Sequence, residues 1–271
     1  MSKRIAILGT ACVLGMALAA APASAATLTG FAGDATTSYG KINPKDADTV
    51  QSWLLGGNVA GPLSDLPNLN FQLGGSYDHN WADQFSQEVW NLGGSAFWAN
   101  NDGRIGINVN YETATRLGHT TNYGAFGEWY FGNFTGMAKG GWLSSGGAAN
   151  GGNGNYLGAA LSAYFIPDLA ITGGVEWAQN LSGHGNQVLG RTGVNTTAGE
   201  IAAEFLFSED YGFSVFAEYD FHSNKIQHEN FNDSAFKMGV RWYAGGGSLV
   251  DHHRNGTLNP WLSGLGAAAA Q

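Results

Sequence analysis

The sequence has few charged residues, few prolines and only one cysteine. Charged residues make up 12% of the 271 positions, whereas about a quarter is usual in soluble proteins. The cysteine, Cys12, lies in the apolar N-terminal segment, so the rest of the chain has no thiol for a disulfide, a zinc site or catalysis. Beyond Ala25 no apolar run approaches the ~18 residues that a membrane-spanning helix needs. If this part of the chain crosses a membrane, it must do so as a closed barrel.

The first 25 residues have the pattern of a secretory signal peptide. Lys3 and Arg4 precede an apolar stretch over 5–21, and the Ala-Ser-Ala sequence at 23–25 fits a cleavage site. We therefore expect export and cleavage after Ala25. Without those two of its 12 basic residues, the chain keeps 10 basic against 21 acidic residues. This acidic excess argues against nucleic-acid binding.

Glycine and aromatic residues are abundant instead, and from residue 26 the chain alternates apolar and polar side chains. The period is that of a strand with one apolar face. In the clearest segment, 104–112, Ile105, Ile107, Val109 and Tyr111 share one face. Each segment is close to the 9–11 residues of a membrane-crossing strand. The segments are 28–39, 50–61, 68–78, 89–99, 104–114, 121–131, 134–144, 155–165, 168–178, 197–207, 211–222 and 234–244.

This pattern predicts an all-β fold, a transmembrane antiparallel up-and-down β-barrel over 26–244. It has twelve strands, or ten if the first two segments, which alternate least, are not strands. The connections alternate in length, as periplasmic turns and outer loops do in such barrels. Long connections are expected near 40–49, 79–88, 115–120, 145–154, 179–196 and 223–233. Short ones are expected near 62–67, 100–103, 132–133, 166–167 and 208–210.

Aromatic side chains gather at both ends of the expected outward face, with smaller apolar residues between them. Two such belts are typical of membrane interfaces, where ring systems meet lipid headgroups. We therefore expect contact with outer-membrane lipids. The tryptophans predicted at these interfaces are Trp53, Trp90, Trp98, Trp129, Trp142, Trp177 and Trp242.

The last segment, from Lys237 to Ala244, has a polar residue, a glycine two positions on and then aromatic residues. With the strand pattern, it resembles the porin-like outer-membrane β-barrel proteins of Gram-negative bacteria. The resemblance implies an outer-membrane location and recognition of this strand by the barrel-assembly machinery. Ala244 stands where a final aromatic is usual, and 27 residues follow. The Gly-Gly-Gly-Ser sequence at 245–248 is interpreted as a flexible break, so 245–271 is expected to be a flexible periplasmic tail.

The strand phase places twelve charged side chains on the inward, lumen-lining face, eight of them acidic. A charge facing lipid at the bilayer midplane would cost ~2–4 kcal/mol for Arg or Lys. In a narrow lumen the acidic excess would enrich cations. The residues are Asp34, Arg104, Glu112, Glu128, Lys139, Glu176, Glu200, Glu204, Glu218, Asp220, Lys237 and Arg241.

These features favour a passive diffusion channel for small hydrophilic solutes, with a weak preference for cations. The first alternative is a non-conducting structural or surface-binding barrel, in which ion pairs fill the lumen and the loop 179–196 binds a ligand. A barrel lipid hydrolase and a secreted β-sandwich are further alternatives. The oligomeric state stays open, because a homo-oligomer interface and lipid contact would both use outward apolar surface.

No catalytic, cofactor or metal site is predicted. The nearest match to a barrel hydrolase is His222 with Ser223, but adjacent strand residues point to opposite faces. Barrel proteases use Asp and His at the rim, but the pair Asp78 and His79 is interpreted as an ordinary loop-facing pair. The pair at 252–253, two histidines, is interpreted as part of the solvated tail.

Overall fold

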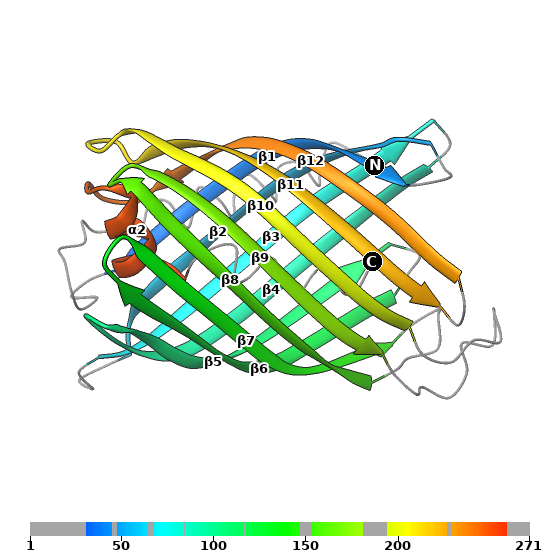
Figure 1. Cartoon of the computed structure of the whole chain (residues 1–271), viewed down its shortest axis with the longest axis horizontal. Helices are drawn as coiled ribbons and strands as arrows, with labels where there is room; N and C mark the ends of the chain where they lie inside the picture. The colour runs from blue at the N-terminus through cyan, green and yellow to red at the C-terminus, as the bar shows by residue number, and fades with distance from the viewer. Residues whose placement is uncertain are drawn as a thin grey trace.

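The computed structural model describes residues 31–44, 48–63, 68–83, 85–115, 118–146, 153–180, 194–226 and 229–258. The predicted signal peptide lies outside these residues, as do 259–271. The described residues form a closed antiparallel barrel of obliquely running strands (Figure 1). The strands are β1 (Ala32–Pro44), β2 (Val50–Pro62), β3 (Leu69–Ala82), β4 (Phe85–Asn100), β5 (Gly103–Ala114), β6 (Gly118–Phe131), β7 (Phe134–Gly146), β8 (Asn153–Ile166), β9 (Leu169–Asn180), β10 (Val194–Ser208), β11 (Phe213–Ile226) and β12 (Glu229–Tyr243).

Each strand pairs with its neighbours in sequence, and the first pairs with the last. The closing ladder between β1 and β12 runs from Asp34 opposite Tyr243 to Pro44 opposite Asp233. Closure satisfies the backbone donors and acceptors of every strand within the wall, as lipid requires. The predicted fold class and the count of twelve strands are confirmed, including the two segments that alternate least.

Several strands run further than the alternation predicts. The hairpin β3–β4 continues to the pair Ala82 and Phe85, and β11–β12 continues to Ile226 and Glu229. The predictions of long connections over 79–88 and 223–233 are therefore wrong, because most of these residues lie in strands. The backbone pairing continues where neither face needs to be apolar, so the hydrophobic period ends before the strand does.

The outer wall is apolar. Ile107 is 65% exposed and Leu157 is 63% exposed, and both lie between rings at the two ends of the barrel. Six of the seven predicted interface tryptophans are exposed, whereas Trp242 is half-buried. No helix within the described ranges is long and apolar enough to cross a membrane.

After β12 the chain turns back to the barrel end and forms the short helix α2 (Leu249–Asn255). Gly245 and Gly247 have φ of 93° and 131°, which glycine adopts at little cost. Ser248 caps the helix in a capping box with Asp251. Figure 1 shows α2 at the end where the short turns lie. The expectation of a flexible tail from residue 245 is therefore wrong through Leu258, because caps and contacts fix this segment.

Candidate functional site: the lumen of the barrel

The barrel has two ends, named here by their connections. At the short-turn end, β2–β3, β4–β5, β6–β7, β8–β9 and β10–β11 are joined. The opposite end is the long-loop end, where residues 147–152 and 181–193 connect their strands. The filled half of the lumen is the part occupied by Ser248–Leu258. The cavity half extends from Leu258 toward the long-loop end.

None of the twelve predicted charged side chains is exposed on the outer surface. Nine are buried, and Glu200, Glu218 and Lys237 are half-buried. Their neighbours along each strand, such as Ile201 and Tyr219, are exposed on the outer wall. The alternation therefore places these charges inside the barrel, in two groups with different surroundings.

The filled half contains a network around Glu204 on β10. Arg241 donates from Nη1 to Glu204 Oε2 at 2.5 Å, and Ser214 donates to Oε1 at 2.5 Å. The Tyr243 hydroxyl also donates to Oε1, at 2.9 Å. Several donors thus offset the desolvation of the Glu204 carboxylate.

His253 of α2 joins this network to the opposite wall. Its Nε2 lies 3.0 Å from the Tyr243 hydroxyl, and its Nδ1 lies 3.1 Å from the Tyr164 hydroxyl. Since Tyr243 donates its only proton to Glu204, the Nε2–H of His253 must donate to Tyr243. The His253 side chain is 1% exposed. The interpretation of His252 and His253 as a solvated pair is therefore wrong.

Arg254 fixes the end of α2 to the β6–β7 turn. Its Nη2 donates to the carbonyl oxygens of Gly132 and Phe134, each at 2.8 Å, and its Nε donates to Thr135 Oγ1 at 3.1 Å. The guanidinium also lies over the Tyr130 ring, 5.2 Å from its centroid. A planar side chain with several donors can make these contacts together, and a lysine cannot.

The side chain of Arg104 on β5 contacts the backbone of α2. It donates to the carbonyl oxygens of Arg254 at 3.1 Å and His253 at 3.3 Å. Its Nε lies 3.7 Å from Glu128 Oε2. Arg104 therefore satisfies carbonyl groups at the C-terminal end of α2, where the helix leaves them without intrahelical donors.

His252 packs differently. Its ring stacks on Tyr243 with centroids 4.5 Å apart and an angle of 8° between the planes. Burial, together with the neighbouring His253, lowers the pKa of His252 to about 4. The neutral ring is thus the form that the packed helix favours.

The cavity half encloses ≈ 320 Å³ and has Leu258 in its lining. Carboxylates outnumber permanent cations around it. The carboxylates are Asp34, Asp78, Glu200, Glu218, Asp220 and Asp233, and the cations are Lys139, Lys237 and Arg241.

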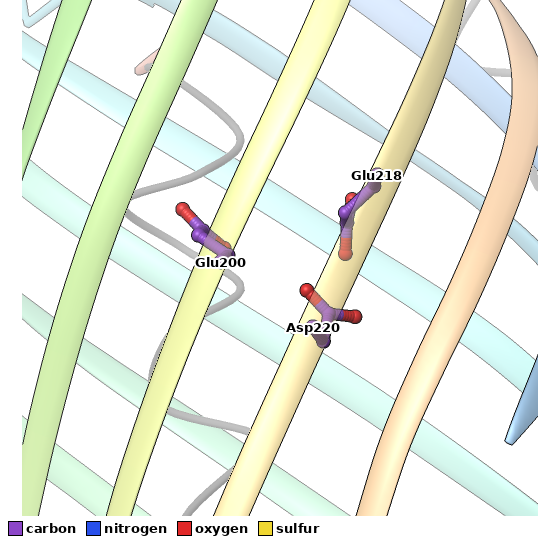
Figure 2. A group of neighbouring side chains, drawn as sticks. All are labelled: Glu200, Glu218 and Asp220. Atoms are coloured by element: carbon purple, nitrogen blue, oxygen red, sulfur yellow. The ribbon is translucent and has the colours of Figure 1, made fainter. Parts of the chain in front are cut away.

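Three of these carboxylates cluster on neighbouring strands. Figure 2 shows Glu200 on β10 beside Glu218 and Asp220 on β11. One carboxylate oxygen of each lies within 4.8 Å of the others. The Lys237 ammonium lies 3.0 Å from Glu218 and 2.6 Å from Asp220. Two of the three carboxylates therefore already pair with a cation, Lys237.

The wall formed by β2 to β6 is neutral around the cavity except at Asp78. It is lined by glycines and by short amide and hydroxyl side chains. Gly74 and Gly93 face each other across β3 and β4. A Cβ at Gly74 would overlap the Asn58 amide, and one at Gly93 would overlap the Asn110 amide. The polar lining residues of this wall are Ser52, Asn58, Gln72, Ser76, Asp78, Asn91, Ser95, Asn108, Asn110 and Asn122.

Sequence reasoning missed the residues that build the filled half, chiefly His253, Arg254 and the inward tyrosines. One signal was present, because Ser248 and Asp251 have the spacing of a capping box. The interpreted pair Asp78 and His79 separates in the structure. Asp78 accepts from Ser52 at 2.9 Å, whereas His79 stacks on Trp81.

No protein-family model matches the sequence, and no curated protein matches it. The barrel is similar to several solved structures at low sequence identity. The outer-membrane channel COG4313 from Pseudomonas putida F1 has a TM-score of 0.55 at 10% identity, over 83% of this chain and 97% of that chain. The translocator domain of the autotransporter NalP from Neisseria meningitidis has a TM-score of 0.52 at 12% identity, over 88% and 95%. The KdgM porin has a TM-score of 0.50 at 10% identity, over 76% and 98%. The chain therefore has the fold of bacterial outer-membrane β-barrels.

Proposed function

We propose that the protein is a passive outer-membrane channel for small hydrophilic solutes, with a weak preference for cations. The observation that carries this proposal is the polar cavity with its excess of carboxylates. The fold shared with an outer-membrane channel and a porin supports the coarser part, a channel. No bond is made or broken in this function, so solutes pass by diffusion alone.

The charge distribution supports the cation preference. Six carboxylates and three permanent cations surround the cavity, inside a wall with an apolar exterior. Such a wall focuses the field of its charges into the aqueous space. A cation entering the cavity half is therefore attracted, and an anion is repelled.

The filled half supports the alternative, a non-conducting barrel. Residues of Ser248–Leu258 occupy the lumen at the short-turn end, and Thr257 and Leu258 are buried. In that case the cavity would be a binding pocket for a small cationic ligand that reaches it from the long-loop end. The expected binding loop 179–196 lies mostly outside the described residues.

Two further parts of the proposal concern assembly. The strand from Lys237 to Ala244 would be recognised by the barrel-assembly machinery, and Trp242 and Tyr243 end β12 as the resemblance implies. The outward apolar surface would contact outer-membrane lipids, and in a homo-oligomer it would also form the subunit interface.

The test is the single-channel conductance of the purified barrel in a planar bilayer, with the reversal potential under a KCl gradient. We expect discrete steps and a potential of the sign that K⁺ preference produces. The double variant Glu218→Gln, Asp220→Asn removes two lining charges and should move the potential toward zero. Glu209→Gln is the matched control, because Glu209 is exposed at the short-turn end. Anion preference in the native chain would refute the charge argument, and a folded barrel without conductance would favour the binding alternative.

A further inference from the structure

We propose that Ser248–Leu258 is an internal plug, by which the C-terminal segment closes the short-turn end of the lumen and limits the solutes that pass. This inference deepens the proposed channel function and rests on it where it concerns permeation. The position of the plug itself can be tested without any measurement of transport.

The segment is bonded to most of the barrel circumference. Leu249 N donates to Asp168 Oδ1 at 3.2 Å, and Val250 N donates to the Pro167 carbonyl at 3.0 Å. These contacts hold the start of α2 at the β8–β9 turn. His253 and Arg254 then reach β5, β7, β8 and β12 through the hydrogen bonds described above, and the Tyr130 hydroxyl of β6 donates to the Arg254 carbonyl at 3.1 Å.

Beyond α2 the segment crosses to the other wall. Thr257 Oγ1 donates to Asp34 Oδ2 on β1 at 2.5 Å. Leu258 N donates to Gln72 Oε1 on β3 at 2.5 Å. A chain bonded to β1, β3, β5 to β8 and β12 spans the lumen and does not merely line one side.

The segment also fills the lumen with apolar side chains. Leu258 packs with Phe97, Phe126, Met137 and Ala160, which point inward from four strands. Nearer the short-turn end, Leu249 packs with a second buried cluster, Tyr164, Ala170, Leu206 and Tyr243. Leu258 is at the same time part of the cavity lining. The cavity thus ends at Leu258, the residue of the segment that lies farthest from the short-turn end.

Hydrogen bonds from a few side chains add to this apolar packing, so removing them should weaken the attachment of the plug to the barrel. Arg254 alone donates three of them. Replacing Arg254 with alanine removes these bonds and leaves the strands of the wall intact. The segment would then leave the lumen more often.

The first experiment measures position. The chain beyond the predicted signal peptide has no cysteine, so Thr257→Cys provides a single thiol. We expect slow reaction with a hydrophilic maleimide, and reaction about tenfold faster when Arg254→Ala is added, since charge-assisted hydrogen bonds are lost. Lys41→Ala is the control, because Lys41 is an exposed cation on β1. Equal, fast labelling in all three proteins would overturn the plug.

The second experiment measures permeation. In the double variant Asp34→Cys, Thr257→Cys, a disulfide would hold the segment in place. We expect low conductance when the double variant is oxidised and higher conductance when it is reduced, whereas reduction should not change the conductance of either single variant. Arg254→Ala should raise the conductance of the chain without cysteines. Migration on unheated gels checks that each barrel is folded.

The outcomes separate the two proposals. If the thiol of Thr257→Cys is protected but no variant conducts, the plug stands and the channel proposal fails. If that thiol reacts quickly and conductance is the same with the disulfide formed or reduced, the channel stands and the plug is overturned. A protected thiol, together with conductance that the disulfide lowers, supports both.

Discussion

The two halves of the lumen contain similar charged residues, which pair with one another in the filled half and line an open space in the cavity half. In the filled half, Arg104 faces Glu128 and Arg241 faces Glu204, so positive and negative charges balance. In the cavity half, six carboxylates line the cavity with only Lys139, Lys237 and the edge of the same Arg241 as permanent cations. Charges inside a barrel therefore have no single meaning, and the occupied volume around them decides their role.

Burial explains the difference. A buried charge is costly unless it is paired and hydrogen-bonded, so the filled half contains matched pairs with additional donors. Beside the cavity, Glu200, Glu218 and Lys237 are only half-buried, so they remain partly solvated and an excess of one sign is tolerated there. Only the second arrangement leaves a net field for a solute.

Replacing Glu204 should have the largest effect on stability. Glu204→Ala leaves Arg241 buried without its carboxylate, and we expect the free energy of unfolding to fall by about 3–5 kcal/mol. Glu218→Ala in the cavity half is the comparison, because Lys237 keeps Asp220 at 2.6 Å. Its cost should be about 1 kcal/mol or less. Urea unfolding in lipid measures both, and equal losses would contradict the distinction between the halves.

Acidification should loosen the filled half. The folded segment lowers the pKa of His252 from 6.5 to about 4. The neutral His252 ring therefore contributes its full stabilisation of the packed segment above pH 6.5. This stabilisation decreases as pH falls toward 4, because the released ring binds a proton that the packed ring does not. The total decrease is about 2–3 kcal/mol.

Hydrogen exchange of the α2 amides, corrected for the intrinsic effect of pH, measures this loosening. The charged or titratable groups around His252 are His253 and Asp251 on α2, and Asp168, Glu204 and the stacked Tyr243 on the wall. His252→Phe keeps the ring on Tyr243 and removes only one titration. The same pH dependence in this variant would assign the effect to the other groups.

Removing Lys237 should sharpen the selectivity of the cavity half. Lys237→Gln leaves Glu218 and Asp220 without their shared cation. Two unit charges ~4 Å apart interact by ~1 kcal/mol in water, so we expect the ratio of cation to anion permeability to rise about fivefold. The reversal potential measures this ratio. A fall in the ratio would show that the cluster does not face the permeation path.

The smallest effect is expected at the start of α2. Ser248→Ala removes the N-cap side chain of a seven-residue helix and should destabilise the packed segment by about 0.5–1 kcal/mol. Faster labelling of Thr257→Cys in this background measures the change. Ser95→Ala on the cavity wall is the comparison, and we expect it to leave the labelling rate of Thr257→Cys unchanged.

The alternating strands could be predicted from the sequence because each has to satisfy the same two environments, lipid outside and polar groups inside. The inward position of Arg104, Glu204 and Lys237 followed from that period alone. The ends of β3, β4, β11 and β12 could not be predicted in this way. Outside the membrane the backbone ladder continues without an apolar face.

The pairing of the inward charges also lay beyond the sequence. Strand phase predicts that Glu204 and Glu218 point inward, but it does not predict whether the lumen beside each of them is filled or empty. Thr257 meets Asp34 across 223 residues of chain, and Arg104 meets the carbonyl of Arg254 across 150. Contacts at such separations depend on barrel closure and on the path of the chain after β12.

The sequence by itself determined the wall of this protein: the period of two, the apolar exterior with its aromatic ends, and the acidic interior. These are local properties, repeated strand by strand. Only the tertiary structure decided what occupies the lumen. The Gly-Gly-Gly sequence at 245–247 suits a flexible break and a sharp turn equally well. Side chains from many different strands, which only a closed barrel brings together, give the segment its fixed place.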